Sequence, residues 1–172
     1  MMRRLALASA LFVAVGSAAP SMAVADTATA TSNIGISASV PNNCTISTSP
    51  MTFAAYDPIG NNASSDLNIT GTVTTTCTSG ASATIMLSQG NNAGNGSTDT
   101  LPIRQLAAGA NKLSYNLYQN TQNTVWANTN ETGVSPKATG IPTVMNVFGR
   151  ILRGQNVPAG NYTDSVQATI AY

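Results

Sequence analysis

Short runs in which apolar or small residues alternate with polar ones recur along most of this chain. Such alternation places every second side chain on one face of a β-strand, so each run predicts a strand with one face to bury. Clusters of Gly, Pro, Asn, Asp and Ser separate the runs and favour turns. The predicted strands cover residues 44–49, 51–56, 67–77, 81–87, 101–106, 113–118, 143–152 and 166–172. This arrangement is typical of an all-β sandwich.

One further alternating run, residues 27–40, has no obvious strand partner. Its apolar or small positions are Ala28, Ala30, Ile34, Ile36, Ala38 and Val40, and Pro41-Asn42-Asn43 interrupts the pattern. Segments near a chain end are usually loose unless a contact holds them. The run is therefore either the first strand of an ordinary sandwich or a strand that completes the sheet of another molecule.

The last alternating run continues to the final residue, so we expect one edge of this strand to be unpaired. An unpaired apolar edge is an aggregation hazard unless another strand or loop covers it. The spare run at residues 27–40 is a candidate cover. We therefore predict a groove with Ile46 on one wall and with Val166, Ala168, Ile170 and Tyr172 on the other.

Residues 1–25 have the pattern of a secretory signal. Arg3 and Arg4 precede a short apolar run, and Ala23-Val24-Ala25 supplies the small residues of a cleavage site. Cys44 and Cys77 follow this signal, so both would reach an oxidising compartment. We predict a disulfide between them, worth on the order of 3–4 kcal/mol in the chain-entropy model.

Composition argues against several functions. Only 8% of residues are charged and the formal net charge is +1, so no basic patch exists for nucleic acid or lipid. Histidine is absent, which removes Ser–His and Cys–His nucleophiles. The carboxylates are scattered, and Asp99 is the only one in the Gly/Asn loop at residues 90–100. We expect no enzyme, no cofactor, no metal site and no small-molecule substrate.

The C-terminal half carries the motifs of a known family. These are Arg104-x-Leu106, Tyr115-Asn116-Leu117-Tyr118, Val125-Trp126, Gly149-Arg150-Ile151, Gly154-Gln155-Asn156-Val157-Pro158-Ala159-Gly160, Tyr162-Thr163-Asp164 and the terminal strand ending in Tyr172. Together with the placement of the two cysteines, they resemble the spore coat protein U domain, shared with major subunits of archaic, Csu-type chaperone–usher pili. One departure is Leu152-Arg153, where the family pattern has a Pro-Ala-like turn.

The resemblance implies an incomplete immunoglobulin-like sandwich that lacks its last strand. A periplasmic chaperone would lend a strand to the open groove, and the N-terminal donor strand of another subunit would replace it at an outer-membrane usher. Residues 26–43 would then be donor strand and linker, and residues 44–172 the pilin domain. The implied function is a pilus subunit for adhesion and biofilm formation, exported through the periplasm to the cell surface.

Two alternatives stay open at this point. One is a secreted coat protein of the same fold that never enters a pilus. The other is a surface- or carbohydrate-binding adhesin that uses Trp126, Tyr118 and the Asn-rich loops. For Arg104 and Arg150 we expect a role in holding loops rather than in binding a ligand.

Overall fold

The structure is a computed structural model that describes residues 27–120 and 124–172. The predicted signal, residues 1–25, lies outside them. The chain divides into two units, one ending at Ala38 and the other spanning Ser39–Tyr172. Among the described residues, no helix has the length and apolar character needed to span a bilayer.

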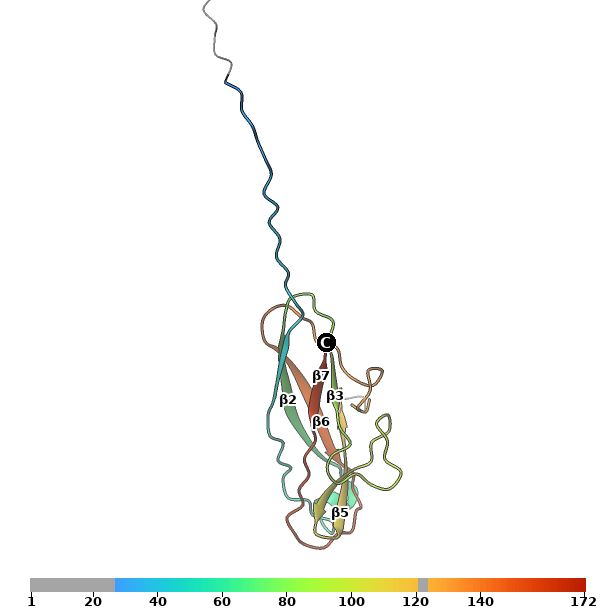
Figure 1. Ribbon diagram of the computed structural model, residues 1–172. Helices are drawn as coiled ribbons and strands as arrows, with labels where there is room; N and C mark the ends of the chain where they lie inside the picture. Colours follow the sequence, from blue (N-terminus) through green and yellow to red (C-terminus); the bar gives the residue numbers. More distant parts are fainter. Residues whose placement is uncertain (1–26, 121–123) are drawn as a thin grey trace, which may run out of the picture. The chain divides into compact units, whose positions relative to one another are not determined.

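The larger unit is built on an antiparallel five-stranded sheet (Figure 1). The strands of this sheet are β1 (Cys44–Thr48), β2 (Leu67–Cys77), β4 (Arg104–Ala108), β5 (Asn111–Tyr118) and β6 (Thr143–Ile151), in the order β1-β2-β6-β5-β4. The long runs predicted for β2 and β6 pair with each other along nine consecutive residues of β2, Leu67–Thr75. β6 is the central strand and β2 lies beside it, and their inward faces place Val73, Val147 and Ile151 in the core.

A second, two-stranded sheet consists of β3 (Thr84–Leu87) and β7 (Ala168–Ala171). The core lies between the two sheets and uses the inward positions of the alternating runs. Its buried members are Val73, Ile85, Leu87, Leu113, Tyr115, Leu117, Trp126, Val147 and Ile151. Trp126 is fully buried, and its Nε1 donates to the Ile85 carbonyl at 2.8 Å. This burial removes Trp126 as a stacking surface for a ligand.

The disulfide joins Cys44 to Cys77, with an S–S distance of 2.08 Å. The two cysteines lie opposite each other at the start of β1 and the end of β2. The bridge therefore attaches the edge strand β1 covalently to the main sheet. The described residues contain no free cysteine.

The structure differs from the prediction in two ways between β1 and β2. Residues 51–56 form no strand, although Met51 and Phe53 do point inward against the core. Gly71 and Gly149 explain the close contact, because a Cβ on Gly71 would lie 2.4 Å from Met51 Cγ and one on Gly149 would lie 2.9 Å from Met51 Cε. The segment therefore packs across the sheet face instead of pairing at its edge. The loop that follows contains a short helix, α1 (Asn61–Ser64), which the alternation did not predict.

The segment predicted as a strand at residues 101–106 begins its pairing only at Arg104. Leu101 is 72% exposed, whereas Arg104 is completely buried. Arg104 donates from Nε to the Ser88 carbonyl at 2.9 Å and from Nη2 to the carbonyls of Leu87 at 2.9 Å and Trp126 at 2.8 Å. As expected, this arginine holds loops together, and it ties the end of β3 to the Trp126 segment.

Candidate strand-binding groove

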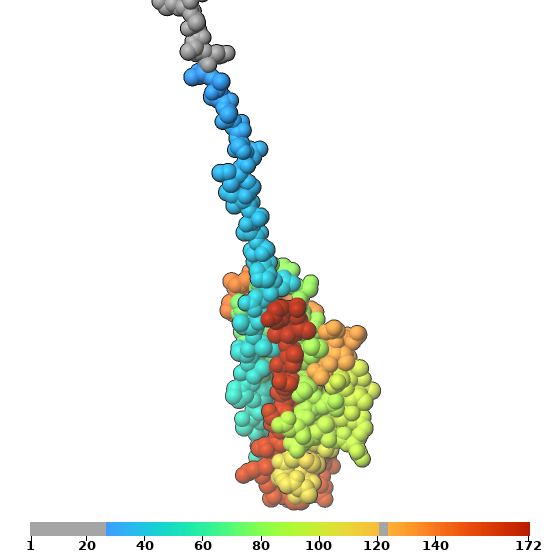
Figure 2. All heavy atoms as spheres, viewed as in Figure 1, coloured from blue at the N-terminus to red at the C-terminus, as the bar shows by residue number. Residues whose placement is uncertain are grey.

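The strands β1 and β7 are neighbours that do not pair with each other. Among the described residues, β1 pairs only with β2, and β7 pairs only with β3. The two strands nevertheless lie in contact. Figure 2 shows the red C-terminal segment beside the teal segment that contains β1. Two strand edges from different sheets therefore border one gap.

The hydrogen-bond pattern shows which backbone groups of β7 face this gap. Ile85 of β3 exchanges backbone bonds with Val134, so its opposite residue, Ile170, is a non-hydrogen-bonded partner. In an antiparallel ladder such pairs alternate with hydrogen-bonded ones. The N–H and C=O groups of Ala168 and Ile170 therefore point away from β3, toward the open edge.

The same argument applies to β1. The Thr78 amide bonds the Asn43 carbonyl, and the Ser49 amide bonds the Thr72 carbonyl, so the odd-numbered positions of this segment bond to β2. The backbone groups of Ile46 and Thr48 consequently point away from β2. Each edge thus offers donors and acceptors to a strand that enters between them.

A cavity of about 310 Å³ lies at this gap and opens to solvent. Its apolar lining comes from both sheets and from the segment after β1. The lining residues that carry apolar side chains are Pro50, Met51, Phe53, Val73, Leu87, Leu106, Tyr115, Leu117, Val147, Val166 and Ala168. Alternate side chains of an extended segment would enter this cavity while its backbone bonded the two edges.

The predicted groove residues occupy three different situations. Val166 and Ala168 line the cavity. Ile46 and Ile170 are half-buried and pack against the core, but they do not line the cavity. Tyr172 is 57% exposed and follows the end of β7. The sequence prediction missed Met51 and Phe53 because their alternation indicated a separate strand.

One end of the cavity is polar. Asp164 lines it and accepts a hydrogen bond from the Tyr115 hydroxyl at 2.7 Å and two from Asn92, from its backbone N and Nδ2, both at 3.1 Å. Burial, followed by the hydrogen bond to Asp164, raises the pKa of Tyr115 above its ordinary value, so this hydroxyl is a fixed donor. The contacts hold the segment before β7 against β5 and so fix this end of the groove.

The segment that precedes β1, residues 27–43, presents the opposite kind of surface. Residues 27–43 contain no helix or strand, and all are exposed. Ile34, Ile36 and Val40 are 87%, 92% and 80% exposed, although isoleucine and valine are usually buried. Their spacing of two residues, together with Ala38, defines an apolar face when the segment is extended. This part of the chain therefore has alternating apolar side chains without a place to bury them.

Comparison with known proteins agrees with this arrangement. The Spore Coat Protein U domain matches residues 29–169. The chain belongs to the spore coat protein U domain family. Protein U of Myxococcus xanthus is 38% identical over 157 residues, which cover 86% of this chain and 88% of that protein. The family match, residues 29–169, includes most of residues 27–43 as well as the sandwich.

A solved structure shares the fold of this spore coat protein U domain. A chain from the crystal structure of the CsuC–CsuE chaperone–tip adhesion subunit pre-assembly complex, from archaic chaperone–usher Csu pili of Acinetobacter baumannii, superposes with a TM-score of 0.57 and 17% identity. The likeness covers 77% of this chain and 40% of that chain, and it establishes an immunoglobulin-like fold. The family is structural, and the protein is not an enzyme.

Proposed function

We propose that this protein is a structural subunit of a chaperone–usher fibre at the cell surface. Copies would join head to tail when residues 27–40 of one subunit enter the groove between β1 and β7 of the next. A periplasmic chaperone would hold the groove before assembly, and an outer-membrane usher would carry out the exchange. The observation that carries this proposal is that one chain has both a groove bordered by two open strand edges and an exposed segment whose apolar side chains alternate.

The two parts are chemically complementary. The groove supplies an apolar floor from β2, β5 and β6 and free backbone groups on both walls. The donor segment supplies Ile34, Ile36, Ala38 and Val40 on one face and Gly35, Ser37 and Ser39 on the other. Burial of an isoleucine or valine contributes roughly 1.5–3 kcal/mol, so a few side chains would dominate the contact.

The contact is heterologous, because the donor and acceptor surfaces are different parts of the same chain. Such contacts generate open fibres when the rotation between copies does not close a ring. The exposure of residues 27–43, all of which lie outside helices and strands, supports their availability for exchange between copies. We further propose roles for the fibre in adhesion and biofilm formation.

A coat protein of the same fold is the second candidate, because the matching family and the Myxococcus xanthus relative carry the names Spore Coat Protein U domain and Protein U. The same strand exchange would then link subunits of a coat. Adjacent genes for a chaperone and an usher would favour the pilus, and their absence would favour the coat.

A peptide experiment tests the strand site itself. Residues 41–172 should be mixed with a synthetic peptide of residues 27–40 and melted. At a peptide concentration 100 times its Kd, binding adds about 2.7 kcal/mol of stability, which corresponds to a Tm increase of roughly 6–15 °C. A peptide with Ile34, Ile36 and Val40 changed to Ser is the matched control. Equal Tm values with both peptides would contradict the proposal.

A further inference from the structure

The outer face of the main sheet carries a second group of side chains that the strand exchange does not use. In the registered strands, Arg150 of β6 lies between Asn68 of β2 and Asn116 of β5. In the next row of that face, Phe148 lies between Thr70 and Tyr118. An arginine, two aromatic rings and three polar side chains therefore form one compact patch, on the sheet face opposite the core.

Arg150 is held in place from two sides. Its Nε donates to Asn68 Oδ1 at 2.9 Å and lies 3.9 Å from Asp66 Oδ2. Its guanidinium carbon lies 5.4 Å from the centroid of the Tyr118 ring, within the range of a cation–π contact. Because these three contacts use Nε or the flat face, the side chain loses most of its rotational freedom before any ligand arrives.

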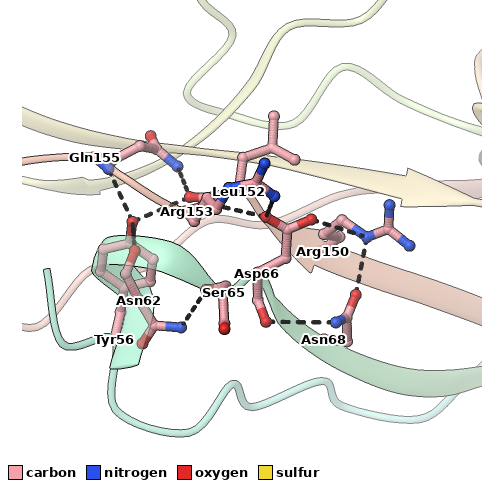
Figure 3. A network of polar contacts seen from close by, with 9 residues as sticks. All are labelled: Tyr56, Asn62, Ser65, Asp66, Asn68, Arg150, Leu152, Arg153 and Gln155. Carbon is pink, nitrogen blue, oxygen red and sulfur yellow. Dashed lines mark hydrogen bonds and ion pairs between the residues drawn. The ribbon is translucent and has the colours of Figure 1, made fainter. Parts of the chain in front are cut away.

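The two terminal nitrogens of Arg150 remain available. Neither Nη1 nor Nη2 has an acceptor among the described residues, and the side chain is 26% exposed. Figure 3 shows both atoms pointing away from Asp66 and Asn68. Asp66 also accepts a hydrogen bond from the Arg153 backbone N at 3.0 Å and forms an ion pair with Arg153 Nη1 at 3.5 Å. A guanidinium with two parallel free donors fits a carboxylate in a bidentate way.

A cavity of about 220 Å³ lies over this patch and is lined by Asn68, Thr70, Tyr118, Phe148 and Arg150, among others. It is smaller than the roughly 300–1,000 Å³ of pockets that enclose drug-sized ligands, so it suits one ring-sized group. The amide of Asn68 and the hydroxyl of Thr70 can bond hydroxyl groups, and Phe148 offers an apolar surface.

From these contacts we propose that the outer face binds an acidic saccharide unit, with its carboxylate on Nη1 and Nη2 of Arg150. The hydroxyl groups of the sugar face Asn68 and Thr70, and its C–H surface faces Phe148. This site is independent of strand exchange, because its residues lie on the opposite face of the sheet from the groove.

Titration of the full-length protein with glucuronate, followed by NMR or calorimetry, tests the site. We expect glucuronate to bind and its methyl ester and glucose to bind at least tenfold more weakly, because neither carries the carboxylate. Arg150→Gln should lose at least tenfold in affinity for glucuronate. The matched control Arg153→Gln, which also contacts Asp66 but is 61% exposed, should stay within twofold.

Three results would overturn the inference. Equal binding of glucose and glucuronate would show that the guanidinium is not used, and unchanged affinity in Arg150→Gln would show the same. Binding of acetate or inorganic phosphate as tightly as glucuronate would show a simple anion site without sugar recognition. The comparison of glucuronate with its methyl ester needs no variant, so it decides the matter even if Arg150→Gln folds poorly.

Discussion

Replacing Ile36 by aspartate should abolish fibre formation, while replacing its neighbour Ser37 by aspartate should leave it largely intact. Ile36 is on the apolar face of residues 27–40 and would be buried in the groove of the next subunit, whereas Ser37 would face outward. Loss of the buried isoleucine costs roughly 1.5–3 kcal/mol, and burying the new carboxylate costs more. We expect a drop of at least about 100-fold in affinity, measured with the corresponding peptides and as fibres per cell by electron microscopy.

The two variants carry the same change in charge one residue apart, so a general effect of acidity on export or solubility would appear in both. Equal loss of fibres in Ile36→Asp and Ser37→Asp would contradict a two-faced strand. Normal fibres from Ile36→Asp would show that this face of the segment is not buried during assembly.

Arg104→Met should destabilise the domain by about 3 kcal/mol, a large part of the roughly 5–15 kcal/mol that holds a typical domain folded. Burial lowers the pKa of Arg104 to about 10, so the side chain still carries its charge at neutral pH. Methionine is unbranched but shorter and has no donors, so the carbonyls of Leu87, Ser88 and Trp126 lose the bonds that Arg104 makes to them. Each lost partner costs about 1–3 kcal/mol, and relief of the buried charge offsets part of the sum.

Urea denaturation of the disulfide-intact protein measures this loss. Arg153→Met is the matched control, because Arg153 is exposed and its ion pair with Asp66 contributes little. Arg104→Lys should fall between the two, since one ammonium group cannot reach all three carbonyls. A change below about 1 kcal/mol in Arg104→Met would contradict the stabilising role of these bonds.

The alternating runs predicted the sandwich because β2, β5 and β6 each have one apolar face, and a period of two fixes which side chains that face contains. The same signal failed for residues 51–56. Their alternation is real, but Gly71 and Gly149 allow the segment to lie flat on the sheet, and no local pattern predicts that approach. The burial of Arg104 could not be predicted from the sequence either, because its acceptors are distant in the chain. Ser88 and Leu87 precede it by 16 and 17 residues, and Trp126 follows it by 22.

The groove could be predicted only in part. The final alternating run identified Val166 and Ala168, which line the cavity. It also suggested Tyr172, which the structure leaves exposed beyond the end of β7. The floor of the groove depends on which strands lie beneath the gap, and this is a property of sheet order rather than of any single segment.

The most direct test of strand exchange is the length of fibres made when full-length subunit is co-expressed with a variant that lacks residues 27–39. The variant keeps its groove, so it can receive a strand but cannot donate one. Negative-stain microscopy should show fibres that shorten steadily as the share of the variant rises, and no fibres from the variant alone. Fibres of normal length from the variant alone would contradict the account, because residues 27–39 would then be dispensable for joining one subunit to the next.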